Sequence, residues 1–152
     1  MALSTFDCAI CNNGIEETLH HLFFQCSLAL DCWTLLQVQS LTSGSVFDII
    51  ESLKFQLNSP IFMSLIILLC WTIWITRNDL IFQGIQPSMG QCRNYLRKEL
   101  TMLLHRVNIK HKLFLEEWII SLGWFLLFFG FSFFWFFVFR ETFVKTAFLF
   151  ML

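Results

Sequence analysis

Four residues near the start of the chain have the types and spacing of metal ligands. They are the cysteines and the histidine of a C-x2-C-x9-H-x4-C pattern: Cys8, Cys11, His21 and Cys26. Two cysteines separated by two residues can point both sulfurs at one ion from a tight turn, and three sulfurs with one imidazole suit tetrahedral Zn²⁺. The pattern therefore predicts a structural zinc site, because four protein ligands leave no position open for a catalytic water.

Two nearby residues compete with these ligands, and two other roles compete with metal binding. His20 is an alternative nitrogen donor, and Cys32 is an alternative thiolate. The cysteines could instead be buried apolar residues of a small helical hairpin, with both histidines exposed. A redox Cys-x-x-Cys pair is less well supported, because no strand precedes Cys8 and no thioredoxin-like βαβ pattern surrounds it. We favour the metal, which can supply folding free energy on the order of 10 kcal/mol to a segment with little core.

The residues between these ligands predict a turn followed by a helix. Asn13 and Gly14 tolerate the positive φ of a tight turn, and the two acids at 16–17 suit the first turn of a helix. Apolar residues then follow on one helical face, which also carries Cys26: Leu19, Leu22, Phe23, Leu30 and Trp33. His21 and Cys26 lie roughly 140° apart around an ideal helix. Binding of one ion by both therefore requires a distorted first turn, or side chains that reach around the helix.

This pattern and a second block downstream resemble the zinc-binding region of plant reverse-transcriptase-like proteins, which derive from LINE-type (non-LTR) retrotransposons. The first block runs from Cys8 to Trp33 and includes the run E-T-x-x-H-L-F-F-x-C at 17–26. The second block, at 71–82, has the form W-x-x-W-x-x-R-N-D-x-x-F. The resemblance covers about residues 8–112. It implies Zn²⁺ on the four ligands of the pattern, in a module that assists nucleic-acid handling.

The sequence carries no feature that is typical of an enzyme. The polymerase section of the related proteins is missing from these 152 residues, as is the helical, tryptophan-bearing stretch before their first cysteine. No acidic pair stands in a Y-x-D-D setting that could hold Mg²⁺, and no glycine-rich phosphate loop is present. We therefore expect a truncated, non-enzymatic module without a small-molecule substrate.

The elements that position these residues are predicted to be helices. The expected fold is all-α: a small CCHC zinc knuckle leads into a helical bundle, and one long apolar C-terminal helix follows. The zinc module takes residues 1–40, the helical region with the second block takes 41–112, and a phenylalanine-rich apolar tail takes 113–152. Helices are expected over 46–57, 61–75 and 91–107, with a break at 58–60, a solvated helix end at 77–79 and a loop at 84–90. The helix over 61–75 is expected to be buried, because a membrane span needs about 20 residues.

The last of these helices carries a basic face. The chain has 10 Lys+Arg and 11 Asp+Glu, but segment 91–112 has six bases and one acid, whereas 1–57 has one base and six acids. Arg93, Arg97 and Lys98 are therefore candidates for contact with nucleic-acid phosphate or anionic lipid, and an ordinary solvated face is the alternative. Tyr95 is the one aromatic residue there, so the helix offers no stacking platform for bases.

The tail contains a candidate transmembrane helix. Residues 118–139 include no charged residue, and a helix of this length, about 33 Å, matches a hydrocarbon core of about 30 Å. The alternative function is therefore a single-pass, tail-anchored membrane protein whose zinc module binds protein in the cytosol, since the bases of 91–112 would stay on that side. Nine of the fifteen residues in 125–139 are Phe, so a reading frame that runs into T-rich sequence explains the tail equally well. Without insertion we expect a nuclear or cytoplasmic protein.

Overall fold

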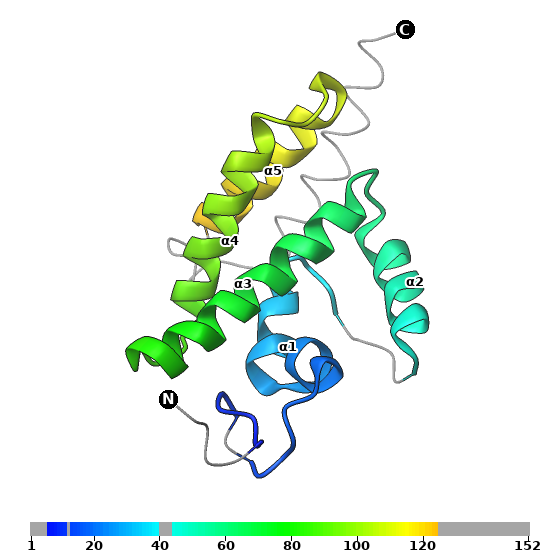
Figure 1. Ribbon diagram of the computed structural model, residues 1–152. Helices are drawn as coiled ribbons and strands as arrows, with labels where there is room; N and C mark the ends of the chain where they lie inside the picture. Colours follow the sequence, from blue (N-terminus) through cyan, green and yellow to red (C-terminus); the bar gives the residue numbers. More distant parts are fainter. Residues whose placement is uncertain (1–5, 12, 40–43, 125–152) are drawn as a thin grey trace, which may run out of the picture. The chain divides into compact units, whose positions relative to one another are not determined.

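The computed structural model describes residues 6–11, 13–39 and 44–124, with side chains as far as Leu122. This part of the chain forms no strand, and one isolated antiparallel β-bridge joins Asp7 and Glu16. The elements follow in chain order as a π-helix, η1 (His21–Gln25), and five α-helices: α1 (Ser27–Thr34), α2 (Val46–Leu57), α3 (Phe62–Gln83), α4 (Met89–Leu104) and α5 (Ile109–Trp124) (Figure 1). The predicted all-α fold is confirmed, with a Cys/His cluster ahead of the bundle.

The central element of the bundle is α3. It contacts η1, α1, α2 and α4 (Figure 1), and its inner face buries Leu65 and Ile73 completely. Thr72 and Thr76 are also fully buried, and their hydroxyls donate to the carbonyls of Leu68 and Thr72, each at 2.9 Å. These polar groups are therefore satisfied within the helix itself, and the apolar side chains around them can pack closely.

The ends of the first long helices follow local sequence signals. Ser45 and Asp48 form a capping box at the start of α2, in which the Asp48 carboxylate accepts the Ser45 N–H at 2.9 Å. Asn58 follows the last residue of α2 and Gly84 follows the last residue of α3, and both adopt the left-handed conformation, with φ of 40° and 69°. The predicted helix over 46–57 is confirmed at both ends, because caps of this kind are encoded locally.

α3 is longer than the sequence pattern predicted. We expected a helix over 61–75 and a solvated end at 77–79, but α3 begins at Phe62 and continues without a break to Gln83. The Asp79 side chain is buried, and it accepts hydrogen bonds from the Tyr95 hydroxyl at 2.6 Å and the Gln91 amide at 3.0 Å, both on α4. The prediction of a solvated end was wrong because α4 supplies donors that offset the desolvation of the carboxylate.

The described residues up to Leu122 belong to one compact unit. Its core combines the predicted zinc module with the helices that follow, and it includes Cys8, Cys26, Trp33, Leu53, Leu69, Leu96, Leu100 and Leu115. The metal-ligand segment therefore shares one core with the bundle. The three-part division at residues 40 and 112 stays a prediction.

The predicted membrane span at 118–139 begins inside α5 and continues beyond Trp124, where the described residues end. Within the described ranges, the helix that is long and apolar enough to cross a membrane is α3, and 39% of its most apolar stretch is buried. The core helices of soluble proteins can have the same length and apolar composition. An anchor at 118–139 therefore stays a prediction.

Candidate metal centre

Cys8 lies in a loop whose base is closed by backbone hydrogen bonds. The Cys8 N–H donates to the Ile15 carbonyl at 2.8 Å, and the Glu17 N–H donates to the Phe6 carbonyl at 2.8 Å. Gly14 has a φ of 65°, which glycine adopts without the strain that a Cβ would add. The predicted turn is therefore present, and it returns the chain alongside the first cysteine.

A widened helical turn brings His21 and Cys26 to the same side of the chain. The Cys26 N–H donates to the His21 carbonyl at 2.7 Å, which is the five-residue spacing of a π-helix. An ideal α-helix would leave the two side chains roughly 140° apart. The Thr18 hydroxyl accepts the His21 N–H at 3.0 Å and fixes the start of this turn. The distortion that the ligand spacing required is thus present as η1.

Cys26 also interrupts the single apolar face that the sequence predicted. Its backbone is extended, with φ −60° and ψ 137°, and α1 begins at the next residue. Leu22 and Ala29 are buried on either side of this break, whereas Leu19 and Leu30 are exposed by 74% and 43%. The prediction of one continuous face was wrong, because it assumed an unbroken α-helix and the break at Cys26 shifts the buried positions.

The four predicted ligands converge on one point. Their donor atoms, three Sγ and one ring nitrogen, all lie within 4.8 Å of one another. The Sγ atoms of Cys8 and Cys26 are 3.9 Å apart, and the Sγ of Cys11 lies 3.4 Å from Nε2 of His21. A tetrahedral Zn²⁺ with bonds of about 2.3 Å to sulfur and about 2.0 Å to nitrogen places its donors roughly 3.5–3.8 Å apart. The cluster can therefore hold a metal ion after small side-chain adjustments.

The cluster is shielded from water. Cys8 is 1% exposed, Cys26 is 0% exposed and His21 is 4% exposed, whereas Cys11 is half-buried. Burial raises the pKa of the Cys8 thiol to about 12. A thiolate is therefore unfavourable here unless a cation compensates its charge, and metal binding must displace the thiol proton.

The two alternative donors lie outside the cluster. The His20 ring packs against Phe24 with 5.9 Å between ring centroids, and its Nε2 has no hydrogen-bond partner among the described residues. Cys32 is buried on α1, where a hydrogen bond with Cys92 of α4 and burial raise the pKa of its thiol. The structure therefore brings together the four ligands of the pattern and gives both alternatives other surroundings.

An ion pair that the sequence analysis missed joins the ligand segment to α3. The Nε and Nη2 atoms of Arg77 donate to one carboxylate oxygen of Glu17, at 2.9 Å and 2.6 Å. The two side chains are only 18% and 15% exposed. No sequence signal linked these residues, because they lie 60 positions apart.

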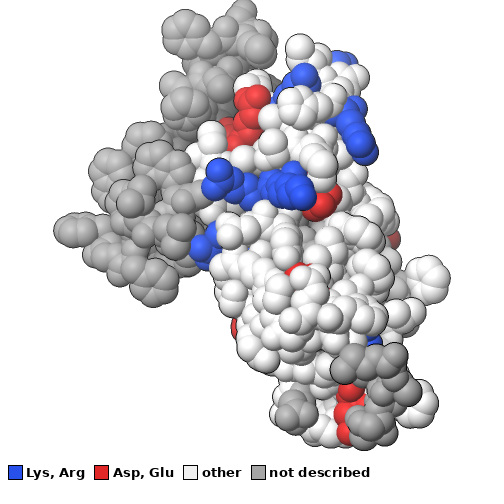
Figure 2. Space-filling model, turned by 60° about the vertical axis from the view of Figure 1, so that its left-hand side comes forward, with Lys and Arg blue, Asp and Glu red and all other residues white. Residues whose placement is uncertain are grey.

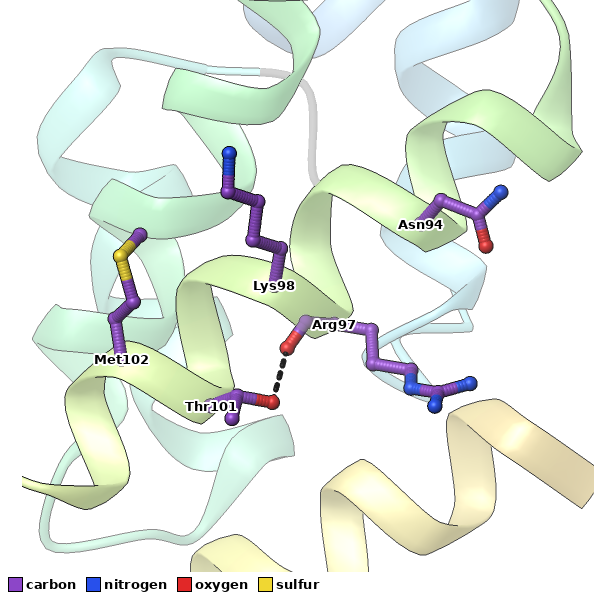
Figure 3. A pocket seen from close by; sticks show the side chains of 5 residues that line it. All are labelled: Asn94, Arg97, Lys98, Thr101 and Met102. Atoms are coloured by element: carbon purple, nitrogen blue, oxygen red, sulfur yellow. Dashed lines mark hydrogen bonds between the residues drawn. The ribbon is translucent and has the colours of Figure 1, made fainter.

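The candidate nucleic-acid residues lie on α4. Arg97 and Lys98 are exposed and Arg93 is half-buried, and Figure 2 shows Lys and Arg side chains gathered in the upper part of one face, with acidic side chains beside them. An open depression is lined by Asn94, Arg97, Lys98, Thr101 and Met102. Figure 3 shows Arg97 and Lys98 leaving the helix in different directions, while the Thr101 hydroxyl donates to the Arg97 carbonyl at 2.8 Å. The two cations therefore do not converge on one point in the depression.

Comparison of the chain with models of protein families, with curated proteins and with solved structures finds no match. What the chain does therefore has to follow from the site itself. The observations that bear on it are the four converging donors, their burial, and the contact between Arg77 and Glu17.

Proposed function

We propose that the chain is a zinc-binding module of a retrotransposon-derived, reverse-transcriptase-like protein, with no catalytic role of its own. The observation that carries this proposal is the convergence of Cys8, Cys11, His21 and Cys26 within 4.8 Å. A second observation supports it, because Arg77 of the W-x-x-W-x-x-R-N-D block contacts Glu17 of the cysteine–histidine block. Both blocks of the resemblance therefore belong to one three-dimensional unit.

The donor set favours zinc over other metals. Three thiolates and one imidazole are soft ligands, and in tetrahedral geometry they are typical of Zn²⁺ rather than of Mg²⁺ or Ca²⁺, which prefer oxygen. Four protein ligands in a buried cluster leave no place for a reacting water. The ion would therefore stabilise the fold of the ligand segment.

Elemental analysis of the purified full-length chain tests the metal. We expect close to one Zn²⁺ per chain in the wild type and a loss of metal in Cys11→Ser. Cys70→Ser is the matched control, because Cys70 is a half-buried thiol of α3 outside the cluster. Wild-type protein without stoichiometric metal, or equal metal in Cys11→Ser, would contradict the proposal.

Nucleic acid is the proposed partner of the module, through the outer face of α4. Exposed Arg97 and Lys98 can each neutralise a phosphate and release counterions, so retention on immobilised polynucleotide should weaken steeply with salt. Replacing both by Gln should lower the affinity and reduce the salt slope by about two. Lys54→Gln, an exposed base on α2, is the control. Absence of retention at low salt would remove this part of the proposal.

A tail-anchored membrane protein with a cytosolic, protein-binding zinc module is the second candidate. The observation that favours it is the uncharged stretch at 118–139. It shares the metal centre with the first candidate and differs in the role of the tail. Membrane fractionation of the full-length and truncated chains separates the two.

A further inference from the structure

We propose that Glu17 and Arg77 are a positioning pair that couples the metal affinity of the ligand segment to the fold of the bundle. This inference rests on the proposed metal site and adds residues that are not ligands. Glu17 lies between the second cysteine and His21, and Arg77 lies in the last third of α3. The side-chain hydrogen bonds of Arg77 go to Glu17 and Asn78 and not to the four donors, so the effect of the pair on the metal would pass through the backbone.

Glu17 lies between the two parts of the ligand segment, one that carries Cys8 and one that carries His21. Its N–H donates to the Phe6 carbonyl at 2.8 Å, which ties it to the segment just before Cys8. One residue later, the Thr18 hydroxyl accepts the His21 N–H at 3.0 Å and fixes the start of η1. A displacement of Glu17 would therefore move donors on both sides of the centre.

Arg77 binds Glu17 from a turn of α3 that is itself held against α4. Its Nε and Nη2 donate to one carboxylate oxygen at 2.9 Å and 2.6 Å, and its Nη1 donates to the Asn78 side chain at 3.2 Å. Two residues along, buried Asp79 accepts hydrogen bonds from Tyr95 and Gln91 of α4. The turn of α3 that carries Arg77 is thus fixed against α4, so the guanidinium can act as an anchor.

The pair is too well shielded to be an ordinary surface contact. Both side chains are less than one-fifth exposed, and the second carboxylate oxygen of Glu17 is buried with no hydrogen-bond partner in the described part of the chain. Exposed ion pairs contribute little, whereas removing one member of a shielded pair leaves an uncompensated charge. Loss of Arg77 would therefore push Glu17 towards water and open the ligand loop.

The test is the Zn²⁺ affinity of the full-length chain in mild detergent, measured by competition with a chromophoric chelator. Glu17→Gln and Arg77→Met should each bind Zn²⁺ roughly tenfold or more weakly than the wild type, the range expected for residues that orient ligands. Glu16→Gln is the matched control, because Glu16 is an exposed acid next to Glu17. The exchanged pair Glu17→Arg with Arg77→Glu should recover part of the affinity. The Co²⁺ absorption spectrum should stay that of a tetrahedral sulfur–nitrogen site.

The outcomes separate this inference from the proposed function. If the wild type binds no Zn²⁺, the proposed metal site itself fails. If the wild type binds but Glu17→Gln matches Glu16→Gln, the positioning role alone is overturned. A loss of helix content in Glu17→Gln at saturating Zn²⁺ also overturns it, because the pair would then be a requirement for folding rather than for affinity.

Discussion

At the scale of single residues, the candidate metal centre includes only one of two adjacent histidines. His21 is 4% exposed and its Nε2 faces Cys11, while the ring of His20 packs on Phe24. Sequence alone left both histidines as possible ligands, because adjacent residues fit the same spacing within one position. The direction of each ring depends on η1. The ligand spacing offered a distorted turn as one of two possibilities, but it did not indicate which histidine that turn would direct at the cysteines.

The two histidines give a matched pair of variants. His21→Ala should lose Zn²⁺ binding by orders of magnitude, because it removes one of four ligands. His20→Ala should keep Zn²⁺ within a fewfold of the wild type and lose only the ring contact with Phe24. Chelator competition on both variants measures the difference. Equal losses would show that the ligand assignment is wrong.

Tyr95 offers a second prediction at this scale, because it is the only tyrosine in the chain. Its hydroxyl donates to Asp79 at 2.6 Å, and this hydrogen bond raises the pKa of Tyr95. The bond therefore contributes stability below the ordinary tyrosine pKa of about 10, and that contribution is lost as pH rises through the raised value. Tyrosinate absorbance should give a midpoint above about 10 that falls in Asp79→Asn. An unchanged midpoint in Asp79→Asn would count against the hydrogen bond.

At the scale of elements, helices with local end signals were predictable and the break at Cys26 was not. α2 has the expected bounds because Ser45, Asp48 and Asn58 mark its ends in the sequence. The helix expected over 91–107 begins at Met89 and ends at Leu104 instead. Hydrophobic periodicity carries no information about the π turn of η1 or about the extended backbone at Cys26.

One side chain stabilises that turn from the next helix. The Trp33 indole N–H donates to the Phe23 carbonyl at 2.8 Å, and its ring stacks on Phe24. Trp33→Phe should leave this carbonyl without its donor and cost about 1–3 kcal/mol of unfolding free energy. Urea denaturation of the metal-loaded chain measures the loss. Trp71→Phe is the control, since Trp71 is 45% exposed, and equal losses would contradict the role of the indole.

At the scale of the whole molecule, the ligand set was accessible from sequence and its attachment to the bundle was not. The four ligands lie within one short segment, where spacing alone limits the possible geometries. Glu17 contacts Arg77 because α3 passes beside the ligand segment, and Asp79 is buried because α4 packs over it. Charged residues of this kind look solvated until the tertiary partner is known.

The role of the tail as a membrane anchor can be tested by a truncation that keeps all of the buried core residues. Leu122 is buried and Trp118 packs against the core, so a chain ending at Trp124 should keep its fold and its metal. If 118–139 is an anchor, the full-length protein stays in the membrane pellet after an alkaline carbonate wash and the 1–124 chain is released. Full-length protein in the soluble fraction would exclude the anchor.

The 60-residue separation between Glu17 and Arg77 has a consequence for biosynthesis. At a translation rate of roughly 5–20 residues per second, Glu17 emerges about 3–12 s before the guanidinium that anchors its loop. During that interval the thiols belong to a nascent segment without its supporting helix. A product that is truncated before codon 77 therefore has a ligand loop without Arg77. We expect such a product to be incompletely folded and to be degraded by quality-control proteases.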